Sequence, residues 1–435
     1  MRKRIEIMLP YSEILGIICI LCVNIGCNRP NQSKITEAAD YNEYLVSQHQ
    51  KVDFPDNQFK KKHTSTTGAL ILAEEHTQYF KETGKIAYLK EAEHWLKRAV
   101  LVPNLNASES YRALAKNYLL QHRFREALIF IDSARYVGGK IKQTQYLSFD
   151  VHMELGNYNK AFSYLDSIQD KKAYDYLTRK AKWYHYKGNT KEMLQQMEAA
   201  TREAELSNRK GQVVEAYTTL ADYYGQVGKI EAAYQYYLKT LEIAPENVSA
   251  KRGIAWIVFS YENNPKEALR ILDSVTQDYN APEYYLLKAE IADYMGKDIE
   301  FVTNLDEYFK KVNNPAYGSM YNACNVSIYV EKTGQLNKAL ELALTEVENR
   351  PTPAAYQLLA YTYLKSGEKE RALNIVEKYV AGKTVNPEVL YKAAEVYKAN
   401  GLDDKLVKLK PNLLESLYQL GPSMEGKVVD LYLTE

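Results

Sequence analysis

Apolar and polar residues follow a helical period through most of the chain. Leu220, Tyr224 and Val227 are separated by four and three residues, so they fall on one face of a helix. Ala221 and Ala233 are small residues on two successive helices of this kind, and small residues at a contact allow helices to approach closely. The pattern predicts pairs of antiparallel helices joined by short turns.

The helix pairs recur along the chain as a repeat. When the segments are aligned on one residue of the second helix, neighbouring positions lie between 32 and 40 residues apart, and seven of the ten are alanine. Seven of the ten residues five positions earlier are glycine, which adopts the left-handed backbone of a turn without steric cost. The ten aligned positions are Ala92, Ala127, Ala161, Met193, Ala233, Ala268, Phe301, Ala339, Ala372 and Leu406. This regularity indicates a repeat protein.

The repeated unit resembles the tetratricopeptide repeat. The best copy covers residues 211–247 and carries residues of that family at Tyr217, Leu220, Ala221, Tyr224, Gly228, Ala233, Tyr237 and Pro245. The resemblance extends over residues 68–415 and implies an all-α fold, a right-handed α-solenoid of about ten TPR-like helix-turn-helix repeats. The 40-residue interval before Ala233 predicts a helix about one turn longer around residues 193–207.

The first residues carry a different pattern. Three basic residues at 2–4 precede an apolar run at 14–23, which is shorter than the roughly 20 residues that a membrane-spanning helix needs. Gly26 and Cys27 follow, and this stretch resembles the lipobox of bacterial lipoproteins, whose cysteine receives a diacylglycerol before cleavage. We therefore expect residues 1–26 to be a lipoprotein signal peptide and Cys27 to be lipidated. An uncleaved N-terminal anchor and a signal peptide without a lipid are the alternatives.

The remaining chain divides into three parts. Residues 27–63 are polar at their start and predict a tether with a possible short helix, and residues 64–410 predict the TPR solenoid. Residues 411–435 predict a C-terminal capping helix and tail, with Pro411 at the start of the helix. The resemblance to outer-membrane repeat lipoproteins implies a location in the bacterial cell envelope, at the outer membrane.

Charge and motifs argue against several classes of function. Lys and Arg number 56 and Asp and Glu 55, so the chain lacks the basic balance of a nucleic-acid-binding protein. No nucleotide-binding, metalloprotease or hydrolase motif occurs, and none of the seven histidines has another at i+4 for a metal. We expect no enzymatic activity, no cofactor and no metal. Most of the 38 tyrosines are explained by packing, and His152 stands at a recurrent tyrosine position, so it is expected in the core.

The resemblance also implies a binding surface, because the first helices of such repeats line a concave groove. The mixture of charged and aromatic residues at their outward positions favours a protein or peptide partner. These groove candidates are Arg112, Lys116, Tyr146, Asp150, Thr178, Lys182, Thr218, Asp222, Trp256, Glu290, Asp293, Tyr361, Tyr391 and Glu395. For any one of them the alternative is a merely solvated position. For the whole chain, the alternative function is a glycan- or nutrient-binding outer-membrane lipoprotein on the same scaffold.

Overall fold

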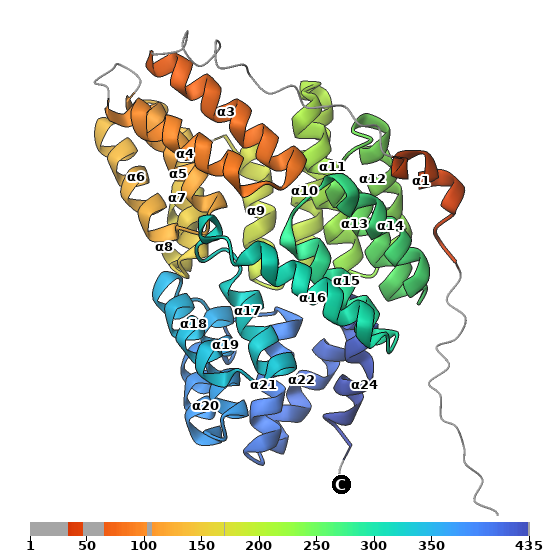
Figure 1. Cartoon of the computed structure of the whole chain (residues 1–435). Coiled ribbons are helices and arrows are strands. Elements are labelled where there is room, and N and C mark those ends of the chain that lie inside the picture. Colours follow the sequence, from red (N-terminus) through yellow and green to blue (C-terminus); the bar gives the residue numbers. More distant parts are fainter. Residues whose placement is uncertain (1–33, 47–64, 102–106, 169, 434–435) are drawn as a thin grey trace, which may run out of the picture. The chain divides into compact units, whose positions relative to one another are not determined.

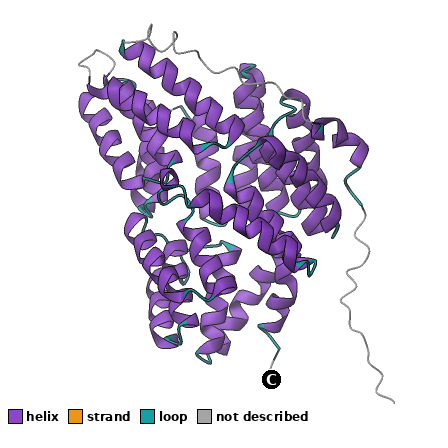
Figure 2. Cartoon of the chain, viewed as in Figure 1, coloured by secondary structure: helices purple, strands orange, loops and turns teal. Residues whose placement is uncertain are grey.

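The computed structural model describes residues 34–46, 65–101, 107–168 and 170–433. Within these ranges the chain forms helices, turns and loops and contains no strand (Figure 2). The expected signal peptide and Cys27 lie outside the described residues. None of the helices in the described ranges is long and apolar enough to cross a membrane.

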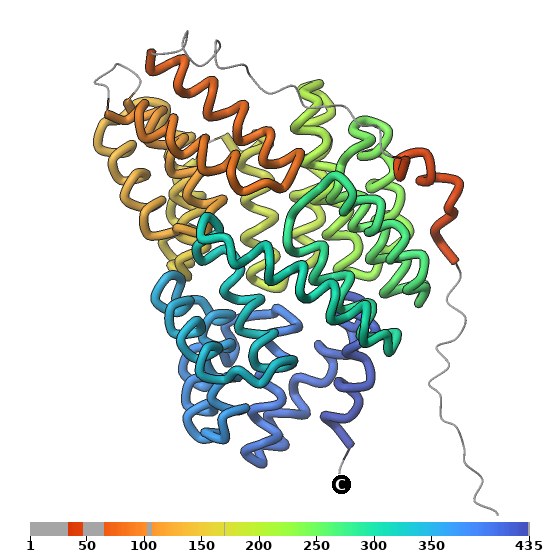
Figure 3. The backbone as a smooth tube through the Cα atoms, viewed as in Figure 1, coloured from red at the N-terminus to blue at the C-terminus, as the bar shows by residue number. Residues whose placement is uncertain are grey.

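Helices follow one another as antiparallel hairpins, and each hairpin packs against the next (Figures 1 and 3). The hairpins of the first half are α3 (Thr66–Thr83) with α4 (Ile86–Leu101), α5 (Ala107–Leu120) with α6 (Phe124–Val137), α7 (Ile141–Glu154) with α8 (Tyr158–Asp166), α9 (Tyr174–Tyr186) with α10 (Thr190–Ser207), and α11 (Lys210–Gln226) with α12 (Ile230–Ile243).

The second half continues the same arrangement. Its hairpins are α13 (Val248–Trp256) with α14 (Pro265–Asp278), α15 (Pro282–Tyr294) with α16 (Asp298–Val312), α17 (Asn322–Ile328) with α18 (Leu336–Asn349), α19 (Pro353–Lys365) with α20 (Lys369–Ile375), and α21 (Pro387–Ala399) with α22 (Asp403–Glu415). The predicted all-α solenoid of about ten repeats is confirmed. Outside the hairpins lie α1 (Ala38–Leu45), the short 3-10 helix η2 (Pro315–Tyr317), α23 (Leu417–Leu420) and α24 (Pro422–Asp430).

The aligned small residues are where the helices meet. Ala127, Ala233 and Ala372 are fully buried, and Met193 fills the same position with a larger side chain. At the preceding turn, His122 and Asn263 replace glycine and still adopt positive φ, of 56° and 51°. The turn therefore requires the left-handed backbone whichever residue occupies it. The expected core position of His152 is confirmed, since its ring is buried and stacks on Tyr164.

Helix lengths follow the sequence in one case and differ in others. Helix α10 spans 18 residues, as its long interval predicted. Three helices end in a π-helical turn, in which one extra residue is accommodated without a break: η1 (Ile257–Tyr261) after α13, η3 (Tyr329–Thr333) after α17 and η4 (Val376–Val380) after α20.

The C-terminal region corrects one prediction. Pro411 does not begin a new helix but lies inside α22, which continues to Glu415. Two buried residues of this helix, Leu406 and Leu413, lie seven residues apart on one face and keep it packed across the proline. The carbonyl that loses its hydrogen bond belongs to Val407, whose side chain is exposed, so that part of the helix faces water. Capping is instead performed by α23 and α24.

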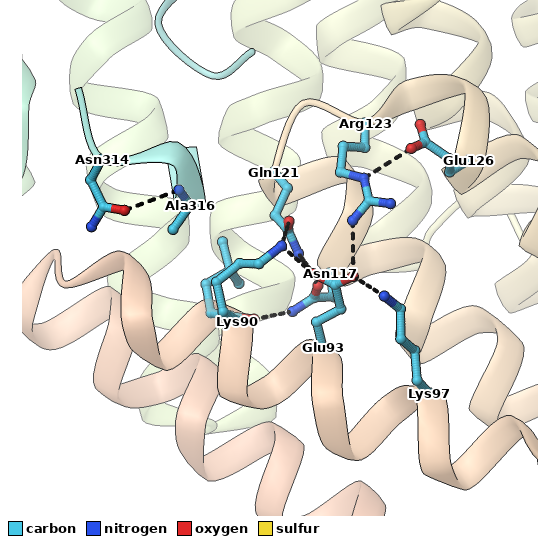
Figure 4. A network of polar contacts seen from close by, with 10 residues as sticks. Lys90, Glu93, Lys97, Asn117, Gln121, Arg123, Glu126, Asn314 and Ala316 are labelled. Atoms are coloured by element: carbon cyan, nitrogen blue, oxygen red, sulfur yellow. Dashed lines mark hydrogen bonds and ion pairs between the residues drawn. The ribbon is translucent and has the colours of Figure 1, made fainter. Parts of the chain in front are cut away.

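A polar network joins the first two hairpins (Figure 4). The carboxylate of Glu93, almost fully buried on α4, accepts hydrogen bonds from Lys90, Lys97, Gln121 and Arg123 at 2.5–3.0 Å. Burial alone would raise the pKa of Glu93, but these four donors outweigh it and hold the pKa well below its usual range. The network therefore compensates the burial of one charge and connects α4 to the turn that begins α6.

The two halves of the solenoid also contact each other along what we call the closing edge. Here the turns of hairpins in the first half meet loops of the second half, about 200 residues away. The Asn280 N–H donates to the Thr83 carbonyl, and the Asn349 side chain donates to the His122 carbonyl, both at 2.9 Å. The closing edge comprises residues 83–84, 122, 154–156, 188 and 225–226 on one side, and 280–281, 319, 348–351, 385 and 418–419 on the other.

Candidate binding surface on the first helices

Two charged groove candidates of the first half are paired with the neighbouring repeat. Asp150 on α7 contacts Arg179 on α9 at 2.6 Å, and Lys182 on α9 contacts Glu154 on α7 at 2.9 Å. Burial would lower the pKa of Lys182, but the charges of Glu154 and Asp150 and the hydrogen bond to Glu154 together outweigh it and raise that pKa. These two ion pairs neutralise Asp150 and Lys182, whose partners could not be predicted from the sequence. They also join α7 to α9.

The same arrangement recurs in the second half. Asp293 on α15 contacts Lys332 in η3 at 2.7 Å, and Glu395 on α21 contacts Lys365 on α19 at 2.9 Å. Each pair links the first helices of adjacent repeats. The surface therefore contains a series of ion pairs between adjacent repeats. The charges in these pairs stabilise the fold and are at least partly unavailable to a partner.

Four other candidates are buried. Arg112, Tyr146, Tyr361 and Tyr391 each expose less than a tenth of their surface. The Arg112 guanidinium donates to the Ser108 hydroxyl at 2.5 Å and to the Thr144 hydroxyl of α7 at 3.3 Å, so it joins its own repeat to the next. We therefore do not include these four residues in the candidate surface.

Three polar candidates already have partners within the chain. Thr218 donates to backbone carbonyls of its own helix, and Asp222 accepts a 2.5 Å hydrogen bond from the Tyr237 hydroxyl. The Trp256 indole N–H donates to the Tyr418 carbonyl at 3.1 Å, so the C-terminal segment covers it. Thr178, partly exposed, makes one long hydrogen bond of 3.3 Å to the Asp175 carbonyl.

Lys116 and Glu290 have no hydrogen bond or ion pair with the described parts of the chain. Lys116 is exposed on α5. Glu290 on α15 is partly buried beside Gly421, and burial together with the nearby charge of Glu388 raises the pKa of its carboxyl to about 7. The Glu290 carboxyl therefore gains or loses its proton near neutral pH.

Two exposed charged residues that the sequence reading missed complete the surface. Glu215 on α11 and Arg252 on α13 make no hydrogen bond or ion pair with any described residue. Solvent reaches Glu215, yet partial burial of its carboxyl by the surrounding protein raises the pKa of that group. Helical spacing could have found both, because Glu215 stands three residues before Thr218 and Arg252 four residues before Trp256.

The candidate surface thus consists of the exposed ends of α9, α11 and α13. It presents the Glu215 carboxylate and the Arg252 guanidinium on adjacent first helices, neither of them with a hydrogen bond or ion pair to a described residue, flanked by the Asp150–Arg179 pair and by Asp222. Such groups form directional, charge-assisted hydrogen bonds with peptide charges and backbone groups. Within the described residues no cluster of His, Cys, Asp or Glu is arranged to hold a metal ion.

Comparison with known proteins identifies the repeat. The tetratricopeptide-repeat model matches residues 214–247, which contain most of α11 and all of α12, and residues 353–381, which contain α19, α20 and η4. No curated protein sequence matches the chain.

Several solved structures are similar. Yeast Tom70 is 13% identical, with 84% of this chain and 94% of that chain covered and a TM-score of 0.36. A tetratricopeptide repeat protein from Parabacteroides merdae is 20% identical, with coverages of 71% and 91% and a TM-score of 0.27. The APC/C hetero-tetramer Cut9–Hcn1 gives 14% identity, coverages of 86% and 92% and a TM-score of 0.36. The chain thus contains two matched tetratricopeptide repeats within a solenoid of ten helix hairpins, a scaffold suited to protein binding.

Proposed function

We propose that the chain is a lipid-anchored adaptor of the bacterial cell envelope, held at the outer membrane through Cys27, which binds a protein or peptide along α9, α11 and α13. The observation that carries the binding surface is the unpaired state of Glu215 and Arg252. Charges on the neighbouring first helices, such as Asp150 and Lys182, are paired between repeats, whereas these two are left for a partner.

The partner expected from this chemistry is a polypeptide that presents a cation to Glu215 and a carboxylate or backbone carbonyl to Arg252. Because the protein around Glu215 already disfavours its charged form, a cation placed there restores a favourable environment for the carboxylate. A partner with both groups is favoured over one with a single charge, since each unsatisfied group would otherwise be desolvated at a cost.

Affinity purification from a detergent-solubilised envelope tests the surface. The variant Glu215→Lys/Arg252→Glu keeps the net charge but reverses both contacts, and we expect it to lose partners that the wild type recovers. The matched control Lys191→Glu/Glu341→Lys makes the same exchange at exposed positions on the second helices α10 and α18. Recovery of the same proteins by the wild type and the Glu215/Arg252 variant would reject this surface.

Metabolic labelling tests the anchor separately. Radiolabelled palmitate is expected to enter the wild-type chain and not the Cys27→Ala variant, which should leave the membrane fraction. A wild-type protein that is soluble and unlabelled rejects the lipid anchor and leaves the binding surface to be judged by the purification.

A further inference from the structure

Residues 34–46, which we call the N-terminal clamp, pack against the second helices of two repeats near the middle of the chain. The clamp consists of a short extended stretch and α1, and it contacts α12 and α14 (Figure 1). Tyr41 and Leu45 of the clamp join the same apolar cluster as Tyr234 of α12 and Ile271 of α14. Tyr41 is only 2% exposed, so the clamp is part of the core of these repeats.

Polar contacts hold the first part of the clamp in register. The Glu262 carboxylate accepts hydrogen bonds from the backbone N–H groups of Ile35 (2.8 Å) and Thr36 (2.6 Å), and from the Thr36 hydroxyl (2.9 Å). The Tyr41 hydroxyl donates to Glu267 at 2.7 Å. Hydrogen bonds to a carboxylate are stronger than those between neutral groups, so this end of the clamp is firmly bound.

Contacts continue to the other end of the clamp. The Arg270 guanidinium donates to the Asn42 side chain, and the Ser274 hydroxyl donates to the Leu45 carbonyl, both at 2.6 Å. Contacts with α12, with α14 and with the loop before α14 therefore extend along the clamp from Ile35 to Leu45.

The clamp shortens the chain between Cys27 and the solenoid. Only residues 28–33 separate Cys27 from Lys34. Because an extended chain gains at most about 3.5 Å per residue, Cys27 stays within ~25 Å of Lys34. The next described helix, α3, begins at Thr66, and the same arithmetic sets an upper limit of ~140 Å on its distance from Cys27 along the chain.

We propose that the clamp makes α12 and α14 the membrane-proximal edge of the protein, with the lipid bilayer surface as the neighbour of this edge. This inference rests on the lipid anchor at Cys27 in the proposed function. The sequence predicts a tether with a possible short helix over residues 27–63, and in the structure the connection from Cys27 to the first described residue is short and ends beside α14. The clamp therefore decides which repeats lie nearest to the membrane.

Energy transfer to labelled lipids tests the inference in the full chain. A donor dye is attached at Lys266→Cys, an exposed position on α14, in a Cys324→Ser background, and the lipid-modified protein is reconstituted into phosphatidylethanolamine–phosphatidylglycerol vesicles with acceptor lipids. The variant Thr36→Ala/Tyr41→Ala/Leu45→Ala removes one side-chain hydrogen bond to Glu262, the hydrogen bond to Glu267 and both buried apolar side chains of the clamp, and it leaves the sequences of α12 and α14 unchanged. Glu43→Ala, an exposed position on α1, is the matched control.

We expect transfer to fall at least about twofold in the triple variant, because the connection lengthens from ~25 Å to as much as ~140 Å, and to be unchanged in Glu43→Ala. Amide hydrogen exchange of residues 35–45 verifies that the clamp has been released. Equal transfer in a lipidated protein with a released clamp overturns the inference. Absence of a lipid on the N-terminal peptide, measured by mass spectrometry, instead overturns the anchor itself.

Discussion

The turn between α7 and α8 and the turn between α19 and α20 have the same backbone but different surroundings. Gly156 and Gly367 both adopt a positive φ, of 71° and 86°. A Cβ atom on Gly156 would lie 2.8 Å from the Pro351 carbonyl oxygen, whereas one on Gly367 would meet nothing within 4 Å. The first turn lies in the closing edge and the second faces open space.

This difference shows that the solenoid is held together in two ways. Stacking of neighbouring hairpins stabilises every repeat protein and involves only adjacent units. The closing edge adds contacts between units far apart in the sequence, such as the ion pair between Arg350 and Glu154 at 3.7 Å. We infer that the two halves unfold together, because losing the closing edge exposes both halves at once.

The largest expected effect comes from a side chain introduced at the closing edge. Gly156→Ala should lower the free energy of unfolding by about 2–4 kcal/mol, the sum of left-handed strain and a backbone clash. Gly367→Ala introduces the strain alone and should cost about 1 kcal/mol. Urea unfolding followed by circular dichroism measures both. Equal losses in the two variants would mean that the contact at Pro351 contributes nothing.

Charge removal at the same edge should have a somewhat smaller effect. Arg350 pairs with Glu154 across the edge and with Glu346 in its own helix, and its guanidinium lies 5.7 Å from the centre of the Phe124 ring. Arg350→Ala should therefore destabilise the protein by about 1–3 kcal/mol, since it leaves Glu154 and Glu346 with less compensation.

The control for Arg350→Ala is Arg371→Ala. Arg371 pairs with Glu368 and covers Tyr363, but all of its contacts lie within one repeat and the side chain is 58% exposed. Its removal should cost no more than about 1 kcal/mol. A thermal unfolding midpoint that falls as far for Arg371→Ala as for Arg350→Ala would remove the distinction between the edge and the repeats.

The comparisons of Gly156 with Gly367 and of Arg350 with Arg371 also show which features could be predicted from the sequence. The turn glycines, the buried alanines and the helix pairs repeat with a period, so they were predictable without any knowledge of distant contacts. Contacts such as those of Gly156 with Pro351 join residues about 200 positions apart and have no periodic signal. The same holds for Trp256, a predicted groove residue that the C-terminal Tyr418 covers.

The pairing of charges between repeats could not be predicted from the sequence either. Asp150 and Lys182 stood at outward positions, and only the structure shows that Arg179 and Glu154 neutralise them. Ion pairs between repeats depend on the rotation of one first helix against the next, which the sequence does not state. The structure shows which first-helix charges are paired within the chain, and the binding face itself stays a prediction.

Glu290 differs from Glu154, which is paired with two cations, because its raised pKa makes its contribution to stability depend on pH. Burial and Glu388 raise the pKa of Glu290 from 4.5 to about 7 in the folded state, so the folded protein binds a proton more tightly than the unfolded chain. Its contribution to stability is therefore lost as pH rises from 4.5 through 7. Glu290→Gln should stabilise the protein by about 1 kcal/mol at pH 8 and have almost no effect near pH 4.5.

Unfolding of the Glu290→Gln variant measured across this pH range tests the assignment. Lys116→Met is the control, because it removes an exposed charge without a partner and should give a difference that does not change with pH. A constant stability difference between wild type and Glu290→Gln from pH 4.5 to pH 8 contradicts the raised pKa.

The smallest effect on stability is expected for Glu215→Gln. This variant distinguishes charges that stabilise the fold from charges that bind a partner. Glu215→Gln should change the free energy of unfolding by no more than about 0.5 kcal/mol, because the carboxylate has no partner to lose. Asp150→Asn, on the same face, breaks the contact with Arg179 and should cost about 1–2 kcal/mol. If Glu215→Gln destabilises the protein as much as Asp150→Asn, Glu215 serves the fold. If it leaves stability intact and weakens partner recovery, its unpaired charge is explained by binding.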